Sequence, residues 1–317
     1  MKMIKKLGLL TLLCFVGISL FSQERYVDER YTYTQHYLYP VLVNPGATGV
    51  GDTELLFNYK NKWSSFDGAP KSLTLSYNGD LGNRLGFGGL LFTDNNGALE
   101  TTKGQVSFSY TISSGSNDVG FGISTEYINH KIGSINGQVE IDDPTVLDRL
   151  DGNSYFDVSF GVYGVYEDKI KYGVALPSLV SSKVEAGDGT VDRELGFIFH
   201  LGYEYDLSED VTVEPSMFVK KLMFVPTHVD LNLRAGFLND RLTGGLTYTL
   251  GAENKLGFLI GTEVRNLNIY YGYNVSSREF QEYNNGTHDF TVAINLSSNS
   301  TKTTEVMQGP EEVKMKK

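Results

Sequence analysis

The chain has 317 residues, of which 40% are hydrophobic and 21% charged, and it contains 35 glycines, 20 tyrosines and 18 phenylalanines. Its formal net charge of −11 argues against nucleic acid as a partner, because nucleic-acid binding needs a basic stripe that the sequence lacks. The length allows one large all-β domain or two ordinary domains. The many glycines and aromatic residues suit strands with aromatic belts better than a soluble enzyme.

Residues 1–23 have the pattern of a secretory signal peptide, with three lysines ahead of an apolar run at 7–21. The run is shorter than the roughly 20 residues that span a bilayer, so an uncleaved anchor is the lesser alternative. Cys14, the single cysteine, follows Leu13 rather than the small residue typical of a lipoprotein signal. Cleavage would remove the three lysines and change the net charge from −11 to −14. The mature chain would have no cysteine for a disulfide, a thiolate metal site or a nucleophile.

Residues 24–52 are rich in tyrosine but lack a long period of either 2 or 3.6 residues. Pro40 and Pro45 interrupt regular structure, while the aromatic content is too high for a disordered tail. We therefore predict an ordered but irregular segment. Its expected place is inside the periplasmic end of the β-barrel that residues 53–296 predict, where it would act as a plug.

The stretch 55–77 predicts a β-hairpin with a compact aromatic loop. In the second arm, the apolar residues Leu73, Leu75 and Tyr77 alternate with small polar residues, which gives the strand two unlike faces. The loop holds the only tryptophan, Trp63, followed at 66–70 by Phe-Asp-Gly-Ala-Pro, in which Asp-Gly supplies a turn and the proline fixes φ. Packing of these aromatic side chains on the barrel's own wall and contact with a partner are equally good interpretations.

Three motifs in this region resemble the PorP/SprF family of outer-membrane proteins, which are associated with the type IX secretion system and gliding motility of Bacteroidetes-type bacteria. They are Gln-His-Tyr at 35–37 followed by Asn-Pro-Gly-Ala-Thr-Gly at 44–49, Tyr-Lys-Asn-Lys-Trp at 59–63, and Phe-Asp-Gly-Ala-Pro-Lys at 66–71. The family usually has alanine where this chain has Gly46. The motifs cover about forty residues near the N-terminus, and the rest of the chain matches only as a barrel-like strand pattern.

The resemblance implies a role beside the type IX secretion system. Family members are linked to secretion or surface anchoring of a cargo adhesin through the C-terminal domain of the cargo, and to a periplasmic partner that binds peptidoglycan. It also implies an outer-membrane location. The residues that we expect to contact a partner are Asn44, Pro45, Trp63, Phe66, Asp67 and Pro70.

Alternation with a period of two residues continues from residue 53 to residue 296 and predicts a transmembrane antiparallel β-barrel of about fourteen strands, as in FadL-like proteins. The expected strands span 54–60, 71–79, 84–93, 104–113, 118–128, 154–166, 168–175, 195–205, 210–220, 227–236, 240–249, 255–264, 267–275 and 287–296. Charged residues on the polar faces include Lys169, Lys171, Asp230 and Arg234. In a soluble sandwich a polar face meets bulk water, whereas in a membrane barrel it meets a wet lumen.

The lengths of the connections favour the barrel over the sandwich. Long loops are expected after odd strands, near Ser64, Asn95, Asp142, Glu185 and Glu282, and tight turns after even strands. Long external loops and short internal turns are typical of outer-membrane barrels. Short loops around Phe224 and Ala252 interrupt this parity. Residues 297–317 are polar and predict a periplasmic tail, for which solvation is a better interpretation than partner binding.

The sequence lacks a G-x-S-x-G elbow, a P-loop, an H-E-x-x-H motif and a C-x-x-C motif, so we predict neither an enzyme nor a cofactor. His200 and His228 fall on expected strands, where a lone histidine is more often a hydrogen-bonded lumen or interface residue than a metal ligand. Acidic residues crowd two loops at 140–151 and 185–192, and we interpret them as solvated charge rather than a calcium site. The alternative functions are a FadL-like transport barrel for hydrophobic solutes and a soluble all-β surface-binding domain.

Overall fold

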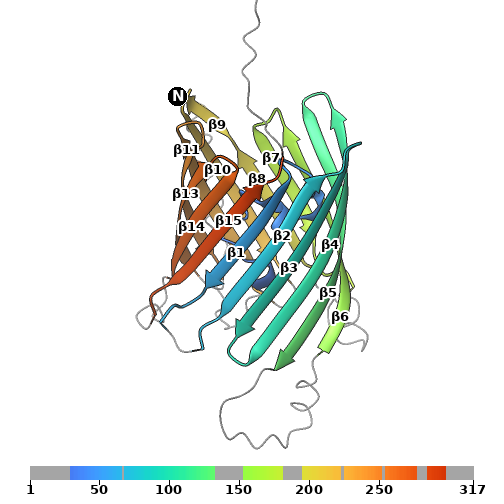
Figure 1. The fold of residues 1–317 in the computed structure, drawn as a ribbon, viewed down its shortest axis with the longest axis vertical. Helices are drawn as coiled ribbons and strands as arrows, with labels where there is room; N and C mark the ends of the chain where they lie inside the picture. Colours follow the sequence, from blue (N-terminus) through green and yellow to red (C-terminus); the bar gives the residue numbers. More distant parts are fainter. Residues whose placement is uncertain are drawn as a thin grey trace, which may run out of the picture.

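The strands form one antiparallel sheet in which β1 pairs with both β2 and β15, so that the sheet closes into a barrel (Figure 1). The computed structural model describes residues 29–65, 68–132, 153–180, 195–222, 225–251, 254–276 and 284–297. The segments β8 and β9 are separated only by Glu204 and both pair with β10, so they form one interrupted strand. The described part of the chain is therefore a closed barrel of fourteen strands, which confirms the predicted fold class.

The strand bounds follow the predicted spans to within three residues, except that β4 begins five residues earlier and β5 ends four residues later than predicted. They are β1 Glu54–Asn61, β2 Lys71–Asp80, β3 Leu85–Asn96, β4 Leu99–Ser114, β5 Asn117–Ile132, β6 Asn153–Tyr166, β7 Ile170–Leu176, β8 Phe197–Tyr203, β9 Tyr205–Ser208, β10 Val211–Lys221, β11 His228–Phe237, β12 Leu242–Leu250, β13 Lys255–Val264, β14 Leu267–Ser276 and β15 Thr287–Asn295.

Side chains alternate between the two faces of the barrel wall. In β2, Leu73 and Leu75 are 40% and 41% exposed on the outer face, whereas Ser72 and Thr74 are buried on the inner face. Leu75 lies opposite Phe57 of β1, which is exposed on the same outer face. This apolar outer surface and polar interior are the arrangement of a membrane barrel, and they rule out a sandwich with its core between two sheets.

One expected long loop is a tight turn instead. We predicted a long connection near Asn95, but β3 and β4 stay paired as far as Asn96 and Leu99, which leaves only two residues between them. Gly97 has φ +60°, a conformation that suits the two-residue hairpin. The polar residues here read as a loop in the sequence, yet Asp94 and Thr101 are buried in the barrel interior. This prediction was wrong because lumen-facing polar residues and loop residues have the same composition.

The connections after β2, β4, β6, β9, β11 and β13 all lie at one end of the barrel, here called the turn end. Several turns there have non-glycine residues with positive φ, among them Asn83, Glu167, Asn239 and Arg265. The opposite end, at the bottom of Figure 1, is called the loop end. The predicted signal peptide at 1–23, most of the predicted tail and the two acidic loops lie outside the described residues.

The N-terminal segment, residues 29–52, lies inside the barrel (Figure 1, blue). It contains three short turns of 3-10 helix, η1 Glu29–Tyr31, η2 Pro40–Leu42 and η3 Pro45–Ala47. Leu42 is 1% exposed and belongs to a core cluster that also includes Leu56 of β1 and Phe218 of β10. Among the described residues, no helix has the length and apolar character needed to cross a membrane.

Candidate functional site in the lumen

The Asn-Pro-Gly motif fastens the N-terminal segment to the wall in the turn-end half of the barrel. The side-chain amide of Asn44 donates from Nδ2 to the carbonyl oxygen of Val162 in β6 at 3.0 Å. Its Oδ1 accepts a hydrogen bond from the backbone N–H of Gly46 at 2.9 Å, which caps η3. Asn44 and Pro45 are both buried. The predicted partner residues of this motif therefore contact the protein's own barrel.

The wall below the motif is made of glycines, and we call this set the glycine floor. Its members are Gly86 of β3, Gly120 and Gly122 of β5, and Gly161 of β6. A Cβ atom added at any of the four would come within 3.0 Å of an atom of residues 44–48. Only residues without a side chain allow two backbones to approach this closely. Many of the glycines that we associated with close backbone approach therefore leave room for the backbone of the N-terminal segment.

Gly46 itself also needs to be glycine. A Cβ atom at this position would lie 2.7 Å from the backbone nitrogen of Tyr163 and 2.8 Å from the backbone carbon of Gly161. Both neighbours are backbone atoms of β6, which cannot move without disturbing the strand pairing. An alanine at position 46, which the resemblance leads us to expect, would therefore not fit against β6 in this chain.

Hydrogen bonds hold residues 30–36 to several strands of the loop-end half. The two lysine contacts and two further side-chain contacts are Lys60 Nζ to Thr32 O (2.7 Å), Lys220 Nζ to Tyr31 O (3.1 Å), Gln35 Nε2 to Thr291 Oγ1 (2.7 Å) and Tyr31 Oη to Glu126 Oε2 (3.3 Å). The partners come from β1, β10, β15 and β5, which lie on different sides of the lumen. The segment therefore crosses the lumen instead of following one wall.

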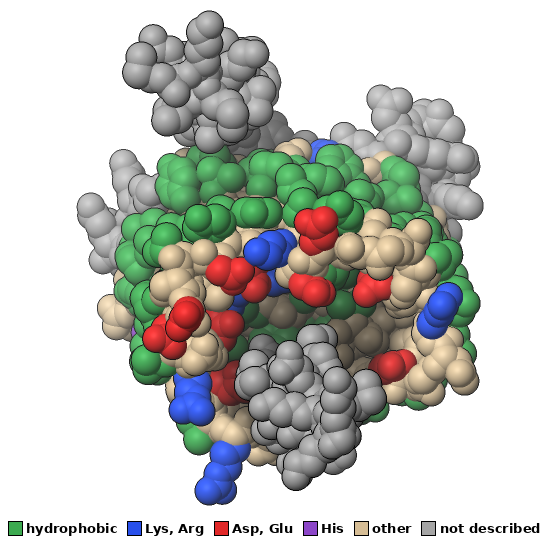
Figure 2. All heavy atoms as spheres, turned by 90° about the horizontal axis from the view of Figure 1, so that it is seen from above, with side chains coloured by type: hydrophobic (Ala, Val, Ile, Leu, Met, Phe, Trp, Pro, Cys, Tyr) green, Lys and Arg blue, Asp and Glu red, His purple; other side chains and the backbone are tan. Residues whose placement is uncertain are grey.

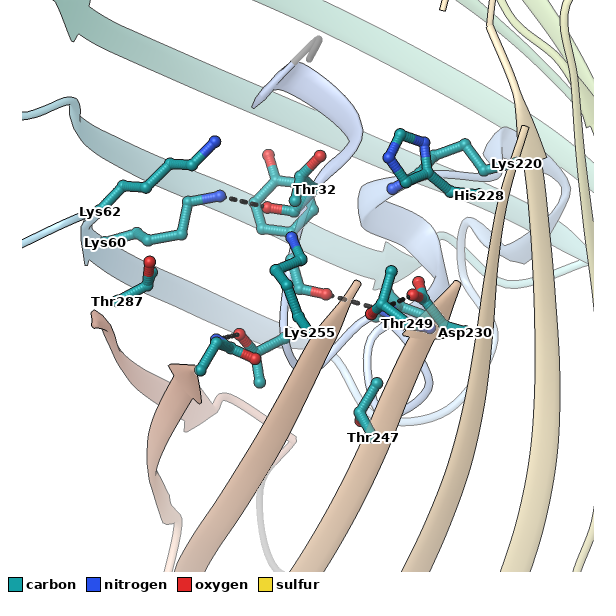
Figure 3. Close-up of a pocket in the computed structure, with 14 residues that line it drawn as sticks. Thr32, Lys60, Lys62, Lys220, His228, Asp230, Thr247, Thr249, Lys255 and Thr287 are labelled. Atoms are coloured by element: carbon teal, nitrogen blue, oxygen red, sulfur yellow. Dashed lines mark hydrogen bonds between the residues drawn. The ribbon is translucent and has the colours of Figure 1, made fainter. Parts of the chain in front are cut away.

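A pocket opens between this part of the segment and the loop-end halves of the strands (Figure 3). Its space, including the part open to solvent, is about 640 Å³. The lining residues are Thr32, Tyr33, Thr34, His36, Lys60, Lys62, Lys220, His228, Asp230, Thr247, Thr249, Lys255, Asn274 and Thr287. Lysine, histidine and threonine dominate, and Asp230 is the one carboxylate among them. Its Oδ1 accepts a hydrogen bond from Thr249 Oγ1 at 2.6 Å.

The first loop lies at the loop end, away from the Asn-Pro-Gly motif. Trp63 is half-buried, and the Nζ of Lys62 lies 4.4 Å from the centroid of its ring, a cation–π arrangement. Backbone hydrogen bonds join Lys62 N to Pro70 O (2.9 Å) and Ser64 N to Gly286 O (2.8 Å), and the second ties this loop to the approach to β15. Pro70 is buried, and Phe66 and Asp67 lie outside the described residues. The structure therefore separates the predicted partner residues into two sets.

An ion-pair network at the turn end was not singled out as a site from the sequence. Arg234 of β11 lies 3.1 Å from both Glu204 and Glu214 and 3.4 Å from Asp240, while Lys171 contacts the same two glutamates at 3.0 and 2.9 Å. Figure 2, viewed from the turn end, shows charged side chains gathered within a rim of hydrophobic ones. The charges of Arg234 and Lys171 on polar strand faces were visible in the sequence, but their partners were not.

Beside this network lies a cluster of buried polar atoms for which the described residues provide no hydrogen-bond partner. They are His36 Nε2, Tyr37 Oη, His200 Nδ1 and Nε2, Glu214 Oε1, Ser216 Oγ and Asn232 Nδ2. His200 and His228 both face the lumen, as expected, but the described residues provide no hydrogen bond to either ring nitrogen of His200, which the sequence interpretation had included. No group of three or more His, Cys, Asp or Glu residues that could hold a metal ion occurs in the described ranges.

Acidification is expected to loosen the N-terminal segment. Burial lowers the pKa of the His36 imidazole below its ordinary value of 6.5, and Asp230 opposes this effect while Lys220 adds to it. The ring also packs on Phe218 and Tyr37. A released segment would take up the proton near pH 6.5, so docking is strongest above that pH and weakens as the pH falls, by at most about 1.4 kcal/mol per pH unit.

Hydrogen exchange of residues 30–50 at pH 8 and pH 5, with each rate expressed as a protection factor relative to the intrinsic rate at that pH, measures this effect. The variant His36→Gln removes the titrating group and should abolish the difference in protection between the two pH values. An equal pH response in the variant and the unmodified protein would contradict the assignment to His36.

Comparison with known proteins identifies a family match and several barrel structures. The family model described as type IX secretion system membrane protein PorP/SprF matches residues 28–294. Among curated proteins, none matches the chain. A Pseudomonas aeruginosa FadL homologue is 10% identical, with 80% of this chain and 92% of that chain covered and a TM-score of 0.46. The CymD monoaromatic hydrocarbon channel is 11% identical over 83% and 91% of the two chains (TM-score 0.46), and the KdgM porin 11% over 76% and 96% (TM-score 0.35).

Proposed function

Because the chain belongs to the PorP/SprF family of type IX secretion system membrane proteins, we propose that it supports type IX secretion or surface anchoring of a cargo adhesin through the C-terminal domain of the cargo. The observation that carries this proposal is the family match over residues 28–294, which takes in the lumenal segment and nearly the whole barrel. The protein is an outer-membrane β-barrel. Its loop end, with the longer connections, would face the cell exterior.

Partner contact would divide between the two ends of the barrel. We propose that Trp63 and Pro70, together with Phe66 and Asp67, form the contact with the cargo at the loop end. Asn44 would contribute indirectly, since with Pro45 it holds the lumenal segment on the glycine floor. At the turn end, exposed charges would meet a periplasmic partner that binds peptidoglycan.

Two other roles fit the lumen less well. A barrel that transports hydrophobic solutes needs a largely apolar binding site, whereas the loop-end pocket is lined mainly by lysine, histidine and threonine. The N-terminal segment also occupies the lumen, and we propose that it acts as a plug. A catalytic role has no motif in the sequence to support it, so we propose a protein that binds and positions its partners and is not an enzyme.

Extraction of the protein from native outer membrane in mild detergent, followed by mass spectrometry, tests this function. We expect a large secreted adhesin or a peptidoglycan-binding periplasmic protein in stoichiometric amount. The variant Trp63→Ala should keep the barrel folded, by its heat-modifiable gel mobility, but lose the adhesin and its surface display. Tyr205→Ala, which removes an aromatic side chain that is 53% exposed at the turn end, is the matched control and should retain both. A lone barrel with bound lipid would favour the transporter, and unchanged display in Trp63→Ala would contradict the loop contact.

A further inference from the structure

Buried polar atoms gather on the lumen side of the wall around Gly202 of β8. His200 is 5% exposed, Glu214 is 1% exposed and Ser216 is 9% exposed, and all three side chains point into the barrel. The described residues offer no hydrogen-bond partner to either ring nitrogen of His200, to Oε1 of Glu214 or to Oγ of Ser216. Folded proteins satisfy nearly all buried polar atoms with protein groups or ordered water, because leaving them unpaired is costly. The group therefore indicates a ligand that completes these hydrogen bonds.

The absence of a side chain at Gly202 leaves the space in which these atoms meet. A Cβ atom added there would lie 3.2 Å from Oε1 of Glu214, 3.2 Å from Cβ of Ser216 and 3.6 Å from Nε2 of His200. On the glycine floor, atoms of residues 44–48 fill the corresponding space, whereas no atom of the N-terminal segment is among these nearest neighbours of Gly202. Hydrogen-bonding distance is about 2.7 to 3.2 Å. The position of the missing side chain is thus close to hydrogen-bonding reach of both Glu214 and His200.

The charges around this space favour a small neutral ligand. Oε2 of Glu214 accepts hydrogen bonds from Lys171 Nζ at 2.9 Å and from Arg234 Nε at 3.2 Å. An anion would be repelled by the carboxylate, and a cation would be repelled by the two basic side chains on its other oxygen. An ionised carboxylate only accepts hydrogen bonds, whereas the Ser216 hydroxyl can donate or accept. Water has both capacities, and a space of roughly the size of a methyl group suits a single water molecule.

We propose that an ordered water molecule takes the place of a side chain at Gly202, where it donates a hydrogen bond to Oε1 of Glu214 and forms a second one with Nε2 of His200. A glycine at this position leaves room for the water, and any larger residue would displace it. This inference is independent of the proposed function.

The water would position a surface on which the N-terminal segment packs. The imidazole ring of His200 stacks on the ring of Tyr163, with the centroids 6.1 Å apart and an angle of 3° between the planes. Tyr163 in turn forms a buried cluster with Val41 and Ala47 of the N-terminal segment. A hydrogen bond from the water to His200 fixes the orientation of this ring. The site therefore connects the turn-end ion-pair network, through Glu214, to the wall beneath the segment.

The variants Gly202→Ala and Gly202→Ser test the site. Both add the same Cβ atom, which excludes the water, but only serine brings a hydroxyl group that can replace it. We expect Gly202→Ala to raise the equilibrium constant for unfolding in urea roughly tenfold or more, because buried polar atoms lose their partner. Gly202→Ser should recover most of this loss. Without the water site, alanine in a strand would be more stable than glycine.

Gly244→Ala and Gly244→Ser are the matched controls, since a Cβ atom added at Gly244 has nothing within 4 Å. These two variants should be equally stable. Equal stability of the two Gly202 variants, or an alanine variant at least as stable as the unmodified protein, would overturn the water site.

A crystal structure of the unmodified, detergent-purified barrel provides a test that does not depend on the folding of any variant. We expect a peak of electron density within about 3.2 Å of both Oε1 of Glu214 and Nε2 of His200. The proposal would be wrong if this position had no density, or if it gave the anomalous signal of a metal ion.

Discussion

The variant Arg234→Met is expected to destabilise the barrel by about 3 to 5 kcal/mol, which is the usual cost of removing one partner from a buried ion pair. Arg234 lies between Glu204 and Glu214, and the side chain of Glu214 is only 1% exposed. Without the guanidinium, Lys171 alone is left to balance two carboxylates that lie within 3.1 Å of it. Urea unfolding, followed by tryptophan fluorescence and gel mobility, measures the loss.

An exposed ion pair at the same end of the barrel provides the control. Lys169 contacts Asp206 at 3.1 Å, but the two side chains are 47% and 59% exposed. The variant Lys169→Met should therefore leave the free energy of unfolding almost unchanged. If Arg234→Met and Lys169→Met lowered the free energy of unfolding by similar amounts, burial would not add to the stability that the ion-pair network provides, and our interpretation of the network would be wrong.

Replacement of Gly122 by alanine is expected to expel the Asn-Pro-Gly motif from the wall while the barrel stays closed. The new Cβ atom would meet the backbone of Pro45 well within 3.0 Å, and backbone atoms cannot rotate out of the way as a side chain can. Overpacking of this kind typically costs about 1 to 3 kcal/mol, and here the N-terminal segment is the part that is free to move. Limited proteolysis should cut residues 29–52 in the variant and leave them intact in the unmodified protein.

Gly244→Ala is the matched control for this prediction. Gly244 lies in β12, and a Cβ atom added there would have nothing within 4 Å. The same chemical change in a strand of the same barrel should then leave the segment protected. If both variants were cut equally, the effect would come from strand propensity and the glycine floor would have no special role.

The period-two pattern was sufficient to predict the barrel, because each strand has one polar and one apolar face regardless of which strand lies beside it. The connections were harder to predict. The turn near Gly97 was missed because Asp94 and Asn96 look like loop residues until the lumen is known to be polar. The local sequence shows which face of a strand is polar, but it does not show whether that polar face meets the lumen or bulk water.

The site could be predicted only in part. The Asn-Pro-Gly motif was recognisable, but its contact with Val162 lies 118 residues away in the sequence, and no local pattern encodes such a distance. The ion partners of Arg234 and the lysines of the pocket are likewise spread over several strands. The positions of glycines 120, 122 and 161 were present in the sequence. Only the folded barrel shows that all three lie against the same part of the N-terminal segment.

The lumenal segment also constrains the order in which the protein can assemble. Thr34 and Gln35, near the beginning of the described chain, hydrogen-bond Asp289 and Thr291 of the last strand, 255 and 256 residues further on. Its other anchor points lie on strands from the middle of the chain. Contacts that close such long loops form late, because the entropy of the intervening chain opposes them until that chain is folded. The segment at 29–52 is synthesised before the strands, and we therefore expect it to reach its final place after them, once the seam between β1 and β15 has closed around it.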